Sequence, residues 1–231
     1  QMQCIHENIN ALSSGDPKTL RGTLRLGAVE SVSALLIVPA LEIFKKEYPY
    51  INVEVSTGYR KTLFETLRKN ETDMIFTIGT LDAPEFCVEI FSFKEEACFF
   101  ARRDHPLAGN VCRAAELFEY PFILTGKDSF LERELSRLAD FYGKSIESFI
   151  RCDITNTILQ LVNRGLGISF LGSFNLRPGL TGGKLVRLEV EDYSFCYDIC
   201  AYRNRHKWVS PHMSGFIAAL EQVRRRGDSH S

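Results

Sequence analysis

Apolar and polar positions follow two different patterns along this chain, and the first change of pattern lies near residue 30. Residues 24–29 are apolar with partial alternation, which predicts a buried strand. A serine-containing break follows at 30–33, and residues 34–44 then have apolar side chains at spacings of three and four, which predicts a helix. The apolar positions of this helix are Leu35, Leu36, Val38, Leu41 and Phe44.

The same two patterns continue to the end of the chain. Further strands are predicted at 51–55, 73–78, 87–90, 96–101, 121–125, 149–152, 165–171 (which begins as a turn), 184–188 and 195–202. Further helices are predicted at 61–69, 114–118, 130–142, 155–163 and 210–225, and the helix at 130–142 places Leu131, Leu135, Leu138 and Phe141 on one face. Each half therefore has the order β-α-β-α-β, which is typical of a doubly wound, mostly parallel sheet.

Two such blocks with one helix left over predict two lobes around a cleft. We expect residues 22–100 and 202–231 to form lobe I and residues 101–201 to form lobe II, with crossings at 99–102 and 200–203. Residues 1–14 have apolar side chains at helical spacing, as at the end of an amphipathic helix whose partner lies elsewhere. The remainder of residues 1–21 has the composition of a linker.

The candidate site of lobe I lies at its strand ends, because ligands of doubly wound sheets bind there. Ser31 or Ser33 is placed to cap the first helix, whose N-terminal N–H groups favour an anionic or polar ligand. An ordinary cap without a ligand is the alternative, as is a buried Thr77 bonded to the backbone. The predicted ligand contacts of lobe I are Ser31, Val32, Ser33, Thr77 and Ile78.

The candidate site of lobe II follows its first and second strands. The predicted ligand contacts there are Thr125, Gly126, Lys127, Phe130, Asn156 and Thr157. Lys127 could pair with a carboxylate or be a solvated loop charge, and Phe130 could line the cleft or belong to the core. Capping alone would explain Asn156 and Thr157. In lobe I, Arg60 is a further candidate for binding an anionic ligand.

Composition narrows the function classes. The chain has 231 residues with 28 basic and 29 acidic side chains, whereas a stand-alone DNA-binding domain usually has a basic excess. No apolar run reaches the roughly 18 residues of a membrane span, and the start of the chain does not resemble a signal peptide. Because the chain begins with Gln1, we expect it to be part of a longer protein.

The chemistry of the side chains indicates binding rather than catalysis. Seven cysteines without a Cys-x-x-Cys pair argue against a disulfide framework and against a zinc site, and we expect most of them to be small buried apolar groups, with a redox sensor as the alternative. Motifs of a nucleophile elbow, a phosphate-binding loop and a His-Glu-x-x-His metal site do not occur. His105, before Pro106, is expected to be a turn residue. We predict no catalytic residue, no metal and no cofactor.

Several short motifs, taken in order, resemble the effector-binding domain of LysR-type transcriptional regulators. These are residues 22–27 (Gly-Thr-Leu-Arg-Leu-Gly), 35–41 (Leu-Leu-Ile-Val-Pro-Ala-Leu), Phe44 with Tyr48-Pro49, 73–75 (Asp-Met-Ile), 104–108 (Asp-His-Pro-Leu-Ala) and 161–168 (Leu-Val-Asn-Arg-Gly-Leu-Gly-Ile). Each motif is weak by itself, but their order and spacing hold over residues 22–223. One departure is Gly172, which stands where the family often has Pro after a strand, and Gly is the more flexible residue.

This resemblance implies a fold, a function and partners. The fold would be α/β, with two Rossmann-like lobes of periplasmic-binding-protein type II joined by two crossing strands. A small effector, an organic acid or amino-acid-like anion, would bind between the lobes and change how a homodimer or homotetramer sits on DNA in the cytoplasm. The DNA-reading winged helix-turn-helix of such proteins would be absent here, and residues 1–14 would be the end of the linker helix.

The resemblance also implies antiparallel pairing, in which the first helix of one subunit meets a helix of the partner's other lobe. Leu36, Ile37, Phe44 and Phe141 are candidate contacts, although core burial would explain them equally well. Two other functions remain open for this fold. A transporter's solute-binding protein would need a signal peptide or lipid anchor, and an enzyme such as a dehydratase would need turnover that depends on a cleft residue.

Overall fold

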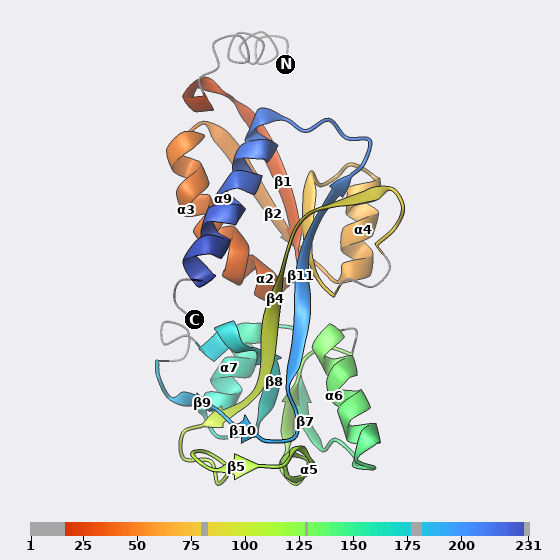
Figure 1. Ribbon diagram of the computed structural model, residues 1–231, viewed down its shortest axis with the longest axis vertical. Coiled ribbons are helices and arrows are strands. Elements are labelled where there is room, and N and C mark those ends of the chain that lie inside the picture. Colours follow the sequence, from red (N-terminus) through yellow and green to blue (C-terminus); the bar gives the residue numbers. More distant parts are fainter. Residues whose placement is uncertain (1–16, 80–82, 128, 177–181, 229–231) are drawn as a thin grey trace. The chain divides into compact units, whose positions relative to one another are not determined.

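The computed structural model describes residues 17–79, 83–127, 129–176 and 182–228 (Figure 1). The chain divides into two units. Unit 1 contains the residues up to Phe93 and those from Asp198 onward, and unit 2 contains Lys94–Tyr197. The helix expected at residues 1–14 lies outside the described residues.

Unit 1 is built on a largely parallel sheet. Its strands are β1 (Gly22–Ala28), β2 (Ile51–Thr57), β3 (Met74–Ile78) and β11 (Phe195–Asn204), which begins in unit 2. β1 lies between β2 and β3 and is parallel to both, so that Ala28 pairs with Thr57 on one side and with Phe76 on the other. β11 continues the sheet antiparallel to β3. The order of the strands therefore reverses between β1 and β3, as the β-α-β-α-β pattern predicts.

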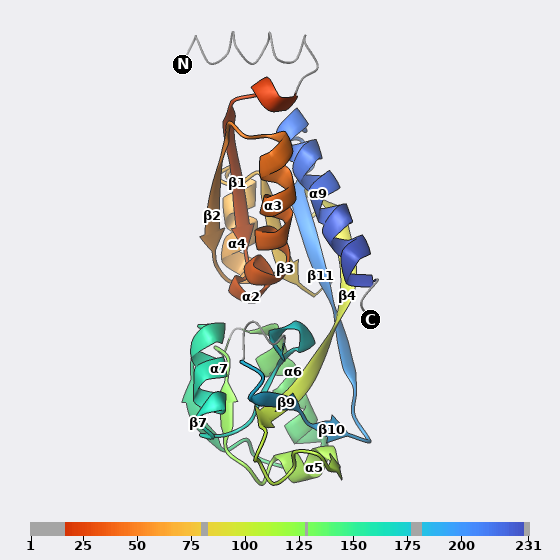
Figure 2. The same cartoon turned by 90° about the vertical axis from the view of Figure 1, so that its left-hand side faces the viewer.

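Helices cover both faces of this sheet. They are η1 (Pro17–Thr19), α2 (Glu30–Val32), η2 (Ser33–Ile37), α3 (Val38–Glu47), α4 (Arg60–Arg68) and α9 (Pro211–Asp228). α3 and α9 run side by side over one face, and α4 covers the other (Figures 1 and 2). The ring of Phe44 in α3 lies 5.5 Å from that of Phe216 in α9, which lies 6.2 Å from Phe76 in β3. These aromatic contacts fix both helices on the sheet.

A π-helical turn interrupts the first helical segment. The N–H of Val38 donates to the carbonyl of Ser33, five residues earlier, and η2 is this wider turn between α2 and α3. Pro39 follows directly, has no N–H to donate and would clash with the carbonyl four residues before it in a regular α-helix. The wider turn accommodates Pro39 without ending the helix, which continues to Glu47.

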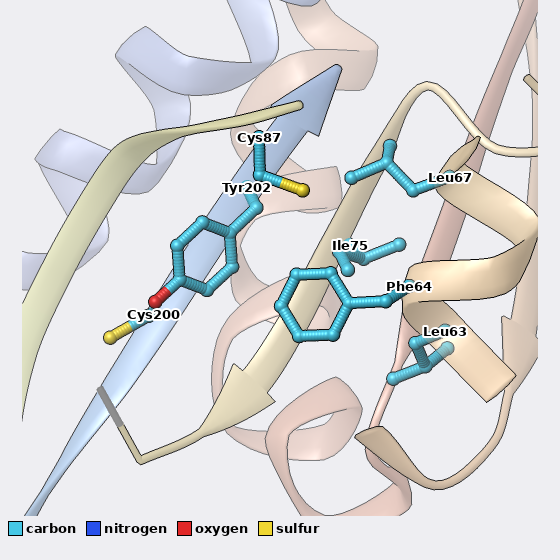
Figure 3. Close-up of a cluster of buried hydrophobic side chains, with 7 residues drawn as sticks. All are labelled: Leu63, Phe64, Leu67, Ile75, Cys87, Cys200 and Tyr202. Carbon is cyan, nitrogen blue, oxygen red and sulfur yellow. The ribbon is translucent and has the colours of Figure 1, made fainter. Parts of the chain in front are cut away.

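The α4 face of unit 1 has a compact apolar cluster, which Figure 3 shows in close-up. Phe64 from α4 packs at 5.4 Å between ring centroids against Tyr202 from β11. The Cys87 thiol points into the same cluster, whereas Cys200 lies at its edge beside the hydroxyl of Tyr202. Both cysteines are buried and occupy small spaces as apolar groups would. The cluster consists of Leu63, Phe64, Leu67, Ile75, Cys87, Cys200 and Tyr202.

Unit 2 repeats the arrangement of parallel strands. Its strands are β4 (Cys87–Arg102), which begins in unit 1, β5 (Val111–Cys112), β6 (Phe122–Leu124), β7 (Ser148–Arg151), β8 (Ser169–Gly172), β9 (Leu185–Arg187) and β10 (Glu189–Val190). Its helices are α5 (Ala114–Leu117), α6 (Phe130–Phe141), α7 (Thr155–Asn163) and η3 (Ser173–Leu176). β6 is parallel to β7 and, through the bridge of Phe122 to Ile168, to the segment that enters β8. β4 pairs antiparallel with β8.

Two neighbouring residues of β4 serve two separate cores in unit 2, because successive strand residues point to opposite faces. Phe99 packs against Phe170 at 4.6 Å and Phe122 at 6.4 Å between ring centroids. Phe100 belongs to an apolar cluster with Ile123 and with the buried side chains of α7. The Phe-Phe pair thus joins the sheet to the elements on both of its faces.

The structure differs from the sequence-based expectation in the crossing segments. The strands predicted at 87–90 and 96–101 are one continuous strand, β4, because the polar residues between them remain hydrogen-bonded in the sheet. The chain changes unit inside β4 and β11, at 93/94 and 197/198, whereas we expected crossings at 99–102 and 200–203. Both strands serve both units, so their apolar ends do not mark the boundaries.

The buried face of α6 is also shorter than predicted, because it ends before the last residue of the helix. Leu131, Leu135 and Leu138 are buried, but Phe141 at the end of the helix is 79% exposed. Across the whole described chain, no helix is both long and apolar enough for a membrane crossing.

Candidate functional site

The three segments that follow β1, β2 and β3 lie close together in unit 1. The N–H of Val29 donates to the carbonyl of Phe76 at 3.0 Å, and the N–H of Gly58 donates to the carbonyl of Ala28 at 3.1 Å. The segments that follow the three parallel strands, 29–33, 58–60 and 77–79, therefore lie at one edge of the sheet, which we call the unit 1 edge. It contains all of the sequence-predicted contacts of lobe I.

Ser31 and Ser33 do not cap the first helix, so this expectation is wrong. The helix begins earlier, at Glu30, with Val29 as its N-cap in extended conformation and without a side-chain cap. The N–H of Ser33 already donates to the carbonyl of Val29, which places Ser33 inside the helical segment. Both serine side chains are half-buried, whereas Val32 between them is fully buried in the core.

Thr77 and Ile78 end β3 at the same edge. Thr77 is fully buried, and its hydroxyl oxygen lies 3.4 Å from Nη1 of Arg60. Arg60, the first residue of α4, also donates from Nη1 to the carbonyl of Gly79 at 2.6 Å. Ile78 is half-buried. The structure thus brings the polar ends of β1 and β3 together with one arginine.

The corresponding edge of unit 2 lies where β6, β7 and β8 end. Because β6 is parallel to both of its neighbours, the segments after the three strands lie at the same side of the sheet, which we call the unit 2 edge. Thr125 and Gly126 follow β6 and are half-buried, and Lys127 is exposed. Asn156 and Thr157 lie after β7, in the first turn of α7.

The polar side chains at the start of α7 are not caps either. Ile154 is the N-cap residue and has no side-chain cap bond, so capping does not explain Asn156 and Thr157. Asn156 is exposed and Thr157 is half-buried. Phe130 begins α6, with its ring 6.1 Å from Phe195 and 6.2 Å from Tyr197, and it keeps partial exposure.

Sequence reasoning missed a polar pair at the unit 2 edge. Ser173 follows β8, and its hydroxyl donates to Oε1 of Glu95 at 2.8 Å. Glu95 reaches this position because Ala97, two residues later in β4, pairs with Gly172. These residues are far apart in the chain, and only the antiparallel pairing of β4 with β8 identifies them as neighbours.

Gly172 is required by space rather than by flexibility. A Cβ atom at this position would overlap the hydroxyl of Tyr197 and the ring of Phe174. Tyr197 is buried, and burial together with the nearby Glu95 and Cys98 raises the pKa of its hydroxyl far above the usual range. The end of β8 is therefore shaped around an uncharged tyrosine.

The buried thiols have the character of apolar groups, as expected for most of the cysteines. Burial raises the pKa of Cys87 and Cys200 to about 11 and that of Cys98 to about 12, and it also raises the pKa of Cys112. Cys196 is exposed. A thiolate is needed for reaction at a sulfur atom, so the four buried positions are poorly suited to redox sensing.

His105 is a turn residue, as predicted. Its Nδ1 accepts a hydrogen bond from the N–H of Leu107 at 3.2 Å, and its ring lies 4.6 Å from that of Tyr120. Among the residues that the structure describes, no group of three or more His, Cys, Asp or Glu side chains is arranged to hold a metal ion.

Comparison with protein families and known proteins identifies similar molecules. A model of the LysR substrate-binding domain matches residues 17–225. The transcriptional regulator CysL of Bacillus subtilis is 24% identical over 195 residues, which are 84% of this chain and 65% of CysL. The RuBisCO operon transcriptional regulator of Acidithiobacillus ferrooxidans is 25% identical over 87% of this chain and 64% of its own length. The chain therefore spans slightly less than two thirds of these regulators.

A solved structure supports the same fold assignment. The regulatory domain of CcmR from Synechocystis, in complex with 2-PG, superposes with a TM-score of 0.75 at 22% identity and covers 88% of this chain and 97% of that one. The fold is accordingly the predicted one, with two α/β lobes of periplasmic-binding-protein type II. A solute-binding protein of a transporter is not favoured, because the similar curated proteins are transcriptional regulators.

Proposed function

Because the chain belongs to the LysR substrate-binding domain family, which matches residues 17–225, we propose that it is the ligand sensor of a bacterial transcription factor. A small effector would bind to it and change how an oligomer of the full-length regulator contacts DNA. The family match carries this proposal, and the grouping of polar residues at the strand ends of each unit supports it. CcmR, whose regulatory domain has the same fold, was solved with a small ligand bound.

The effector contacts would come from both strand-end edges. In unit 1 these are Ser31, Ser33 and Ile78, with the buried Val32 and Thr77 shaping the edge from behind. In unit 2 they are Thr125, Gly126, Lys127, Phe130, Asn156 and Thr157. Hydroxyl, amide and ammonium groups donate hydrogen bonds, so a small organic acid or an amino-acid-like anion suits these edges.

The role of the domain would be binding and not catalysis, in the cytoplasm where the regulator meets DNA. The family consists of transcriptional regulators. Sensing requires only that the effector binds two states of the protein with different affinity, because this difference shifts their populations.

Self-association would proceed through the outer faces of α3 and α6. Leu36, Ile37 and Phe44 are buried in unit 1, so core packing explains these three predicted contacts. Val38 on α3 and Phe141 on α6 are instead 55% and 79% exposed. Exposed apolar side chains on the two helices favour a homodimer, or a homotetramer built from such dimers.

A thermal-shift screen of metabolites tests the sensor function, since a ligand that binds only the folded state raises the melting temperature. We expect a carboxylate to stabilise the wild-type protein and to bind more weakly when Ser31 and Ser33 are both changed to Ala. Ser214→Ala, at an exposed position on α9, is the control. Unchanged affinity in the double variant would show that the ligand binds elsewhere and does not contact Ser31 or Ser33.

A further inference from the structure

We propose that one end of unit 1 binds the phosphate backbone of duplex DNA. This end, where β1 and β2 begin, lies at the opposite end of the strands from the unit 1 edge, and we call it the basic end. It consists of residues 45–50, which end α3 and form the turn before β2, and residues 203–208, which lead from β11 toward α9. The role rests on the proposed function, because it is the regulator that brings DNA to this domain.

Strand pairing and a hydrogen bond bring these two segments to the same end. Gly22 pairs with Ile51, so β1 and β2 begin side by side. Tyr48, which follows α3, donates from its hydroxyl to the carbonyl of Pro211, the first residue of α9, at 3.3 Å. The turn before β2 and the loop before α9 therefore lie together, at the end of unit 1 where β1 begins (Figures 1 and 2).

The loop between β11 and α9 is fixed by contacts on its inner side. Nη1 of Arg203 donates to the carbonyl of Arg205 at 3.2 Å, which closes the turn on itself. Nζ of Lys207 lies 2.5 Å from Oδ1 of the buried Asp73. The N–H of Arg205 donates to the carbonyl of Phe86 at 2.7 Å. Two basic side chains of this loop thus hold its shape, and the backbone of Arg205 is fixed while its side chain is exposed.

Basic side chains from two elements are exposed at this end. Arg205 and His206 are exposed on the loop, and Lys45 and Lys46 are exposed in the last turn of α3. Nζ of Lys45 donates to the carbonyl of Pro49 at 2.5 Å, a neutral acceptor that does not cancel its charge. Lys45 and Lys46 also complement the negative end of the α3 dipole. Arg205 follows a strand instead, so a helix dipole does not explain its position.

The basic end is positive although the chain as a whole is not. Residues 45–50 and 203–208 contain five basic side chains and one acidic side chain, Glu47. Asp73 offsets Lys207, so three positive charges remain, whereas the chain has a formal net charge of −1. This balance is positive without Lys18 and Arg21, which lie before β1. The adjoining residues do not change it, because they are three basic and three acidic side chains: Arg25, Arg68, Lys69, Glu54, Glu71 and Glu85.

Duplex DNA is the polyanion that fits this surface. It carries one negative charge about every 1.7 Å along its axis, so separate cations can contact several phosphates at once. α9 also begins here, where the hydroxyl oxygen of Ser210 accepts the N–H of Met213 at 3.3 Å, and the N-terminus of a helix adds partial positive charge. Phosphate contacts need no apolar anchor, whereas Trp is typical of the centre of protein–protein interfaces. Trp208, 67% exposed on the same loop, therefore distinguishes DNA from a protein partner.

Fluorescence anisotropy of a labelled DNA duplex of arbitrary sequence, at several salt concentrations, tests this contact. The variants are Arg205→Gln, Lys46→Gln and the double variant, which remove charges from the loop and from α3. Lys61→Gln is the matched control, because Lys61 is exposed in the first turn of α4, at the opposite end of unit 1. Trp208→Ala and competition by poly-glutamate test for a protein partner, and melting temperatures report folding.

We expect weak binding of DNA to the wild-type protein, which falls with salt at a log–log slope of roughly −2 to −3. Each single variant should bind about 3- to 10-fold more weakly and reduce the size of this slope by about 1, with a larger loss in the double variant. Lys61→Gln and Trp208→Ala should bind like wild type. No binding at low salt, wild-type affinity in the folded double variant, a loss in Trp208→Ala or equal competition by poly-glutamate would each overturn the DNA contact.

The DNA contact and the sensor function can fail separately. The double variant should keep the wild-type response in the thermal-shift screen of metabolites, because both changes lie far along the strands from the unit 1 edge. A wild-type protein that binds a metabolite but no DNA would overturn the contact at the basic end alone. A protein that binds DNA but no metabolite would leave this contact standing and count against the sensor function.

Discussion

The hydroxyl group of Tyr197 in β11 lies where the side chain of residue 172 would begin, and Gly172 is therefore the residue that fits at the end of β8. The ring of Phe174 closes the same space from the other side. Bulk added here must displace buried side chains of unit 2.

Gly172→Ala should lower the free energy of unfolding by about 1–3 kcal/mol, the usual cost of overpacking a closed interior. Urea denaturation measures this change. Tyr197→Phe removes the overlapping oxygen, so the double variant should lose less than the sum of the single variants. Gly58→Ala is the control, because its Cβ would meet only ordinary contacts. Strict additivity in the double variant would contradict the proposed overlap.

Replacing Phe141 with Lys should weaken self-association, because it puts a charge into the apolar contact proposed for α6. Val38→Lys should do the same from α3. Sedimentation over a range of micromolar concentrations would show a shift toward monomer in both variants. Trp208→Lys, at a side chain that is 67% exposed but lies outside both helices, should leave the distribution unchanged. A wild-type protein that stays monomeric at high micromolar concentration would rule out this interface.

Stability should fall as the pH drops below neutrality, in part through His105. Burial lowers the pKa of His105, with the charge of Asp104 acting in the opposite direction. The folded state therefore binds fewer protons than the unfolded state below the ordinary histidine pKa of about 6.5, and acid favours unfolding. Protonation of Nδ1 would also break its bond from the N–H of Leu107.

Urea midpoints between neutral and mildly acidic pH would test this. His105→Gln should show a smaller loss toward acid than wild type, and His206→Gln, at an exposed position, should not. A residual slope should remain from His212, whose pKa is lowered by burial as well. Equal slopes in His105→Gln and wild type would show that His105 does not titrate across this range.

Alkylation of the native protein should separate the cysteines by exposure. In a Cys4→Ser background at mildly alkaline pH, the exposed Cys196 should react with iodoacetamide first. Cys87, Cys98 and Cys200 should react only after denaturation, because their pKa values lie near 11 to 12 and their thiolate fractions are small. Mass spectrometry of tryptic peptides would identify the modified positions. Rapid labelling of Cys98 in the folded protein would mean that unit 2 opens readily.

Much of the fold is predictable from local patterns. The parallel order of unit 1 follows from two buried strands, 24–29 and 73–78, each adjoining a helix with three- and four-residue spacing. The failures have physical causes: the polar stretch inside β4 stays in the strand because pairing partners on neighbouring strands hold it. Phe141 continues the helical spacing of α6, but it lies beyond the end of the surface that α6 covers.

The candidate site was predictable only as far as topology alone determines it. Strand ends locate Ser31, Thr77 and Thr125, because the carboxyl ends of parallel strands share an edge. The capping role assigned to Ser31 or Ser33 failed because Val29 begins the helix with its backbone alone. The contact of Ser173 with Glu95 depends on which strand lies beside β8, and no local pattern contains that information.

The π-turn at η2 determines in which direction the side chains before it face. A π-turn has one residue more than the α-helical turn that it replaces, and each residue advances an α-helix by about 100°. A chain shortened by one residue between Ser33 and Ile37 could run as an unbroken helix on the same α3, and Ser31 would then face a different direction. The direction in which the two serines face is thus set by the length of this segment. For the ligand site proposed at these serines, single-residue deletions there should change ligand selectivity more than many side-chain replacements.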